Sequence, residues 1–101
     1  MGITYAIAAS GALPVVSACV VLTKAGVSAM TLAAPSADGV VLRVVSYSDN
    51  AHTITATSLV YDGTTGVNTT GTFAAFKGAA VTLIGWGGKW LVGSANLVTW
   101  A

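Results

Sequence analysis

Apolar residues along this chain recur in short segments, many with the period of two that places alternate side chains on opposite faces of a β-strand. In residues 2–9 the larger residues Ile3, Tyr5 and Ile7 alternate with small or polar ones. Residues 15–22 are instead a nearly continuous apolar run, which indicates a strand buried on both faces. About eight segments are expected to be strands, namely 2–9, 15–22, 27–34, 40–46, 52–61, 79–86, 89–94 and 97–100.

Turn-forming residues separate these segments. Asp38 and Gly39 form one turn signal, and Gly87 and Gly88 form another between two strand-like runs. The second predicts a tight hairpin, because the favoured two-residue hairpin turns need positive φ. Residues 62–71 are polar and contain three glycines, so they are expected to form a loop. The predicted fold is one all-β domain over residues 1–101, a small sandwich or barrel-like fold of short antiparallel strands with an N-terminal arm at 1–13.

Composition strengthens the β assignment and adds an expectation about surface. Of 101 residues, 54% are hydrophobic and 7% charged, against about 25% charged in ordinary soluble domains. The chain has no Glu and no Gln, which are strong helix formers, whereas its abundant Val and Thr favour strands. A chain with so few charges is expected to cover apolar surface against other subunits, and symmetric self-association is the commonest way to do so.

Charge and hydropathy exclude two classes of partner. The net charge is +1 and the cations Lys24, Arg43, Lys77 and Lys89 are scattered, so no basic patch for nucleic acid is expected. The longest apolar stretch, residues 5–22, is interrupted by Gly and Pro, and it is a poor match to the about 20 apolar residues of a membrane helix. No membrane partner is expected.

The residues able to carry catalysis are few. The candidates are Asp38, Asp49, Asp62, His52 and the single Cys19. Two of the aspartates precede glycines, as turn residues do, and no nucleophile motif accompanies the histidine. His52 is therefore predicted to be structural and Cys19 a small buried apolar residue with no internal disulfide partner. We expect no enzyme activity, no metal site and no cofactor.

The tryptophans admit two interpretations. Trp86 and Trp90 flank the predicted hairpin, and Trp100 is next to last. They could fill the core or cover a sheet edge, or they could anchor an interface, where Trp is enriched. The residues put forward for a partner interface are Ile3, Tyr5, Ile7, Trp86, Trp90 and Trp100.

Several segments together resemble small proteins encoded among bacteriophage head genes, the head decoration and head-fibre proteins. They extend from about residue 11 to residue 92, and their order and spacing carry the resemblance. The matching segments are 11–14 (GALP), 31–35 (TLAAP) with 38–39 (DG), 51–56 (AHTITA), 72–75 (TFAA) with 77–78 (KG), and 88–90 (GKW).

The resemblance implies a β-rich structural virion protein, a homotrimer that binds the major capsid protein on the outside of the phage head. It implies synthesis in the host bacterial cytoplasm and no active site. Residues 2–9 lie outside the resemblance, and their alternation would suit strand addition to the capsid protein. The alternative function is a receptor- or glycan-binding module of a phage tail, using residues 62–71 and exposed tryptophans.

Overall fold

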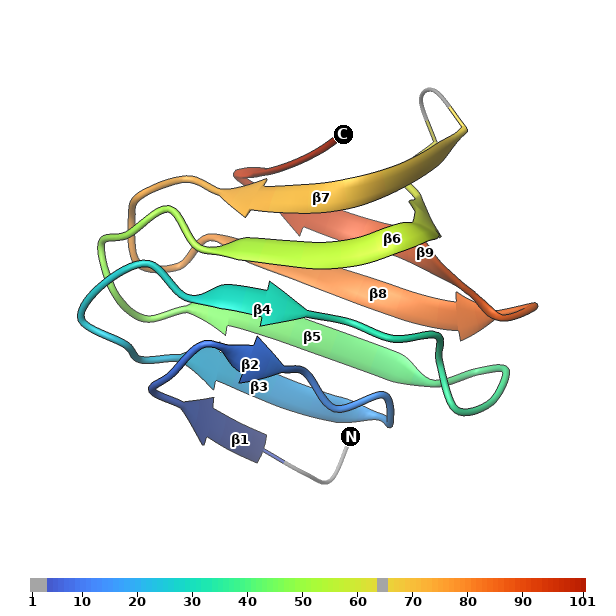
Figure 1. The fold of residues 1–101 in the computed structure, drawn as a ribbon, viewed down its shortest axis with the longest axis horizontal. Coiled ribbons are helices and arrows are strands. Elements are labelled where there is room, and N and C mark those ends of the chain that lie inside the picture. Colours follow the sequence, from blue (N-terminus) through green and yellow to red (C-terminus); the bar gives the residue numbers. More distant parts are fainter. Residues whose placement is uncertain (1–3, 64–65) are drawn as a thin grey trace.

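The computed structural model describes residues 4–63 and 66–101, and within them every regular element is a β-strand (Figure 1). This confirms the all-β prediction. The strands are β1 (Thr4–Ile7), β2 (Gly11–Ala12), β3 (Ala18–Leu22), β4 (Ala29–Thr31), β5 (Val41–Ser46), β6 (Thr53–Tyr61), β7 (Val67–Phe73), β8 (Ala80–Trp86), β9 (Lys89–Asn96) and β10 (Val98–Trp100).

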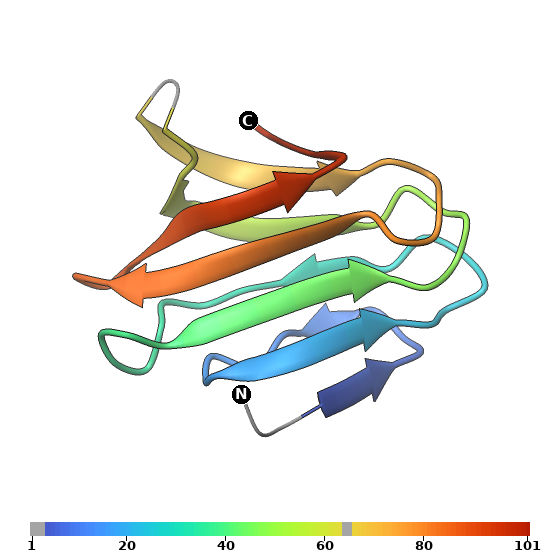
Figure 2. The same cartoon turned by 180° about the vertical axis from the view of Figure 1, so that it is seen from behind.

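The strands form one sheet that curls into two layers (Figures 1 and 2). One layer has the order β1-β3-β5-β8-β9, and the other contains β2, β4, β6, β7 and β10. A short parallel pairing joins the layers along one side, where Val60 and Tyr61 of β6 lie beside Trp90 and Leu91 of β9.

The N-terminal half winds as a coil, and here the prediction of an antiparallel fold was wrong. From β1 to β6 the chain alternates between the two layers, so each strand pairs in parallel with the strand one turn of the coil away: β1 with β3, β3 with β5, β2 with β4, and β4 with β6. Crossing to the other layer after every strand provides the long connection that parallel pairing requires. The remaining pairs, β5–β8, β8–β9, β6–β7 and β7–β10, are antiparallel.

The Gly-Gly hairpin is confirmed. Gly87 and Gly88 have φ values of 61° and 75°, and they connect β8 to β9 directly after the pair formed by Trp86 and Lys89. The backbone N–H of Gly87 also donates to the Asp38 carboxylate at 2.8 Å. The Asp-Gly turn at residues 38–39 is thereby tied to the hairpin turn.

The prediction of a loop over residues 62–71 was wrong for its second half. Val67–Phe73 is strand β7, which pairs with both β6 and β10. Asn68, Thr69 and Thr70 resemble loop residues in sequence, but Thr70 pairs with Thr55 of β6 and the other two lie in the same strand. Residues 64–65 lie outside the described part of the chain.

The core lies between the two layers. In the first layer Val20, Val44 and Val81 are in register across β3, β5 and β8, and each is at most 1% exposed. In the second layer Met30 and Ile54 are in register across β4 and β6, and both are buried. In β4 and β6 the inward face is the one that the period-two pattern marked as apolar.

Candidate interaction surface

His52 is buried between the two layers, as expected of a structural histidine, and its two ring nitrogens have different partners. The backbone N–H of Ser28 donates to Nδ1 at 2.9 Å, so Nδ1 carries no proton. In the neutral ring the proton is then on Nε2, which lies 2.8 Å from the Ser48 hydroxyl oxygen and donates to it. The ring of Phe73 packs edge-on against the imidazole, with centroids 6.3 Å apart.

This geometry does not make a nucleophilic Ser–His pair. A histidine that activates a serine needs a free lone pair facing the hydroxyl and a proton on the opposite nitrogen. In His52 the arrangement is reversed. The lone pair is on Nδ1, which faces the Ser28 N–H, and the proton is on Nε2, which faces the Ser48 hydroxyl. Burial, and secondarily the positive charge of Lys24, lowers the pKa of His52 below its ordinary value, which favours the neutral ring in this position. His52 connects the loop before β4 with the segment before β6.

Two of the aspartates have structural roles at turns. Asp38 accepts from the Gly87 N–H, and Asp49 accepts from the Lys77 N–H at 3.1 Å. Cys19 is a free thiol, half-buried in β3 rather than fully buried. Among the described residues no group of three or more His, Cys, Asp or Glu side chains is placed to hold a metal ion.

The three tryptophans fall into two classes. Trp90 is fully buried and its indole N–H donates to the Ala33 carbonyl at 2.8 Å, while Trp100 is 8% exposed against Gly71. These two are core residues in this fold, as the first of the two interpretations expects, and neither is an exposed anchor on the single chain. Trp86 is 62% exposed at the end of β8 and is available to a partner.

The N-terminal arm is part of the chain's own sheet over the residues described. Tyr5 and Ile7 lie in β1, which pairs in parallel with β3, so that Tyr5 is beside Val20 and Ile7 beside Leu22. Tyr5 is 36% exposed although its register neighbour Val20 is fully buried. Ile3 lies outside the described residues.

The structure reveals a row of apolar side chains that sequence analysis missed. Residues paired across neighbouring strands point to the same face of a sheet, and four consecutive pairings connect five apolar residues on the outward face. Trp86 lies two residues beyond Ile84 on that face. We call these six residues the apolar band: Val41, Ile84, Leu91, Tyr61, Val67 and Trp86.

The apolar band is exposed over most of its length. Ile84, Leu91, Tyr61 and Val67 are 37% to 46% exposed, and Trp86 more so. It crosses five neighbouring strands, in the spatial order β5, β8, β9, β6 and β7. Its residues therefore form one continuous surface and are not scattered. Contiguous exposed apolar patches of this kind mark protein interaction sites.

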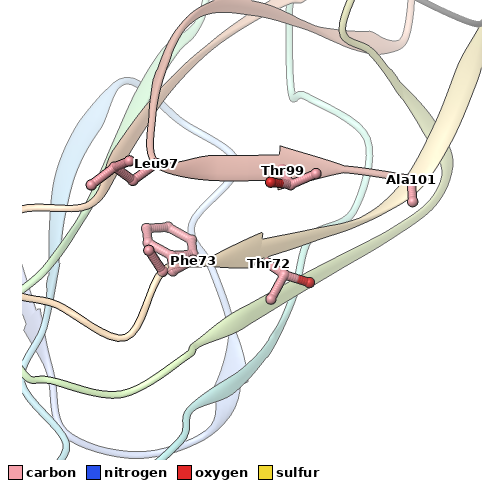
Figure 3. Close-up of a pocket in the computed structure, with 6 residues that line it drawn as sticks. Thr72, Phe73, Leu97, Thr99 and Ala101 are labelled. Carbon is pink, nitrogen blue, oxygen red and sulfur yellow. The ribbon is translucent and has the colours of Figure 1, made fainter.

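A separate hollow lies beside β7 and β10 (Figure 3). Its lining consists of Thr72, Phe73, Ala74, Leu97, Thr99 and Ala101. These side chains supply apolar contacts and two hydroxyl groups, with no acid, base or metal ligand.

No helix of the described chain is long and apolar enough to cross a membrane. The chain matches no protein-family model, and it matches none of the curated proteins with which it was compared.

Proposed function

We propose that the chain is a structural virion protein, a capsid decoration or head-fibre protein that binds the outer surface of a phage head. The observation that supports this most is the apolar band, a continuous exposed apolar surface on a chain in which only 7% of residues are charged. Such a surface is suited to permanent contact with other protein subunits. The phage head as the place of action is drawn from the sequence resemblance.

The apolar band is the proposed contact between copies in a homotrimer. Trp86 and Tyr61 lie in it, and exposed aromatic residues are the side chains most often found as interface anchors. The major capsid protein is the proposed second partner, after synthesis in the host bacterial cytoplasm.

The proposed mechanism is cohesion through burial of apolar surface. Each Å² removed from water stabilises the assembly by about 25 cal/mol before the costs of association are deducted. A subunit that lies across a joint between capsid proteins adds this free energy to the shell. The proposed mechanism has no chemical step, and it gives His52, Asp38 and Asp49 their hydrogen-bonding roles within the fold.

Immunogold labelling of purified phage particles tests this function. Antibodies raised against the purified chain are applied to particles of the phage or prophage whose genome encodes it. Regular labelling of heads is the expected result. Labelling confined to tails would favour the receptor- or glycan-binding alternative, and unlabelled particles would contradict a virion role.

A further inference from the structure

The N-terminal end of the sheet leaves two strand edges open. β1 and β2 are the last strands at the two ends of the sheet path β1-β3-β5-β8-β9-β6-β4-β2, so within residues 4–63 and 66–101 each pairs on one side only. They belong to the same turn of the coil, β1 in one layer and β2 in the other (Figure 1). β1 and β2 run in opposite directions, and β1 extends beyond β2 at this end (Figure 1).

The direction of the main-chain groups in β1 and β2 follows from the hydrogen bonds that the chain makes there to the neighbouring segment of the same sheet. The Ile7 carbonyl accepts from the Thr23 N–H at 2.9 Å, and the Leu13 N–H donates to the Thr31 carbonyl at 2.8 Å. Main-chain groups of consecutive residues in a strand point to opposite sides. The N–H and C=O groups of Ala6 and Ala12 therefore point away from the sheet.

These edges lack the usual protection against pairing with another chain. Natural edge strands carry charged residues, prolines or bulges, whereas no charged residue precedes Lys24 and no proline precedes Pro14. The row of core side chains also continues to the open end, because Tyr5 is in register with the buried Val20. At this end the row is not fully covered, since Tyr5 is 36% exposed. An added strand beside β1 would cover Tyr5.

We propose that the open end pairs with the open end of a second copy of this chain. A two-fold axis perpendicular to the layers places β1 beside β1 of the other copy in an antiparallel pair, because β1 extends beyond β2 at this end (Figure 1). A two-fold interface also brings each residue near its own counterpart. The absence of charge before Lys24 means that no like charges of this segment meet.

This pairing is separate from the proposed trimer contact. The apolar band begins at β5 and extends through β8, β9 and β6 to β7, whereas the open end consists of β1 and β2. The two-fold contact alone gives a dimer. Together with a trimer it gives a closed assembly of six chains, so in both cases the number of chains is even.

The first test is the solution mass of the Ala6→Pro variant. Proline removes only the outward-pointing N–H, and edge strands tolerate it, so the bonds of Tyr5 and Ile7 to β3 remain. Sedimentation velocity should give an even multiple of the 10.0 kDa chain mass for the native protein and half that mass for the variant. A native mass equal to one or three chains, or an unchanged mass for Ala6→Pro, would overturn the pairing.

Ala75→Pro is the matched control. Ala75 is exposed in the turn after β7, where the Phe76 N–H bonds the Ala74 carbonyl at 2.8 Å, a three-residue turn whose central φ suits proline. This variant should keep the native mass.

Amide hydrogen exchange tests the same pairing without any substitution. The Ala6 amide should be protected at high protein concentration and lose protection on dilution, while the Val44 amide in β5 stays protected throughout. Rapid exchange at Ala6 at every concentration would overturn the proposal. Protection that arises only when phage heads are added would overturn it as well, because the edges would then take a capsid segment.

Discussion

The indole of Trp100 lies against the Cα of Gly71 on the neighbouring strand. The two residues are directly paired between β10 and β7, and a Cβ added to Gly71 would lie 2.7 Å from the Trp100 ring. This close approach holds the C-terminal strand on the sheet. Main-chain hydrogen bonding to β7 extends one residue past β10, since the Ala101 N–H donates to the Thr70 carbonyl at 2.9 Å.

Gly71→Ala should therefore destabilise the protein by about 1–3 kcal/mol, the usual cost of forcing an extra methyl group into a packed site. Urea unfolding followed by tryptophan fluorescence measures it. Gly93→Ala is the control, because a Cβ there would lie 3.2 Å from the movable Ile84 Cδ1. Equal midpoints for the two variants would show that Trp100 moves away freely.

Stability should fall as the pH is lowered from neutral. Because the pKa of His52 is lower in the folded chain than its ordinary value of 6.5, the unfolded chain binds more protons once the pH drops below about 6.5. The loss continues until the pH reaches the folded-state pKa, and above about 6.5 His52 contributes no pH dependence. A protonated Nδ1 would also face the Ser28 N–H that now donates to it.

Unfolding midpoints at pH 7.5 and 5.5 measure this effect. His52 is the only histidine, and histidine is the side chain whose charge ordinarily changes in this range. His52→Asn keeps an acceptor near the Ser28 N–H but cannot titrate, so its midpoint should change less between the two pH values. An equal pH dependence in both proteins would assign it to other groups.

Trp86 and Trp90 should respond oppositely to truncation. Trp90→Ala should cost about 3–5 kcal/mol of folding stability, as for other buried aromatic residues. Trp86→Ser should change stability by about 0.5 kcal/mol or less, as at other surface positions, but it should weaken association between copies. Unfolding curves and sedimentation mass together separate the two effects. A large loss of stability in Trp86→Ser, with unchanged mass, would contradict the assignment of Trp86 to the apolar band.

Leu97 offers a substitution that should relieve strain. It lies between β9 and β10 with φ of 59° and is 63% exposed, so neither its backbone conformation nor its side chain favours leucine. Left-handed geometry costs about 1–2 kcal/mol for residues other than glycine. Leu97→Gly should raise the thermal midpoint, because the relief exceeds the added freedom of the unfolded chain. A clear decrease in the midpoint would mean that Leu97 makes contacts that outweigh the strain.

The period of two in the sequence predicted which residues share a strand face, but not which strands are neighbours. Ile54 and Ala56 are buried and Thr55 and Thr57 are exposed, as the alternation predicts. Parallel pairing of β3 with β5 requires the chain to cross between layers. No local pattern records that crossing, so the coil was missed.

The same limit applies to the tryptophans and the apolar band. The Gly-Gly hairpin fixes the pairs Gly85 with Trp90 and Ile84 with Leu91, so its register could have placed Trp90 inward and Ile84 beside Leu91. Tyr61 joins the apolar band only through the parallel contact of β6 with β9. That contact depends on the curl of the whole sheet, which the sequence pattern does not reveal.

Binding of the purified chain to phage heads tests the proposed function most directly. Heads are prepared from a phage in which the gene for this chain is deleted, mixed with fluorescently labelled protein, and separated on a density gradient. The proposed function predicts that the protein sediments with the heads and saturates at a fixed number of copies per head, with fewer copies for Trp86→Ser. Protein that stays at the top of the gradient at every concentration, while still folded, would contradict a role on the capsid surface.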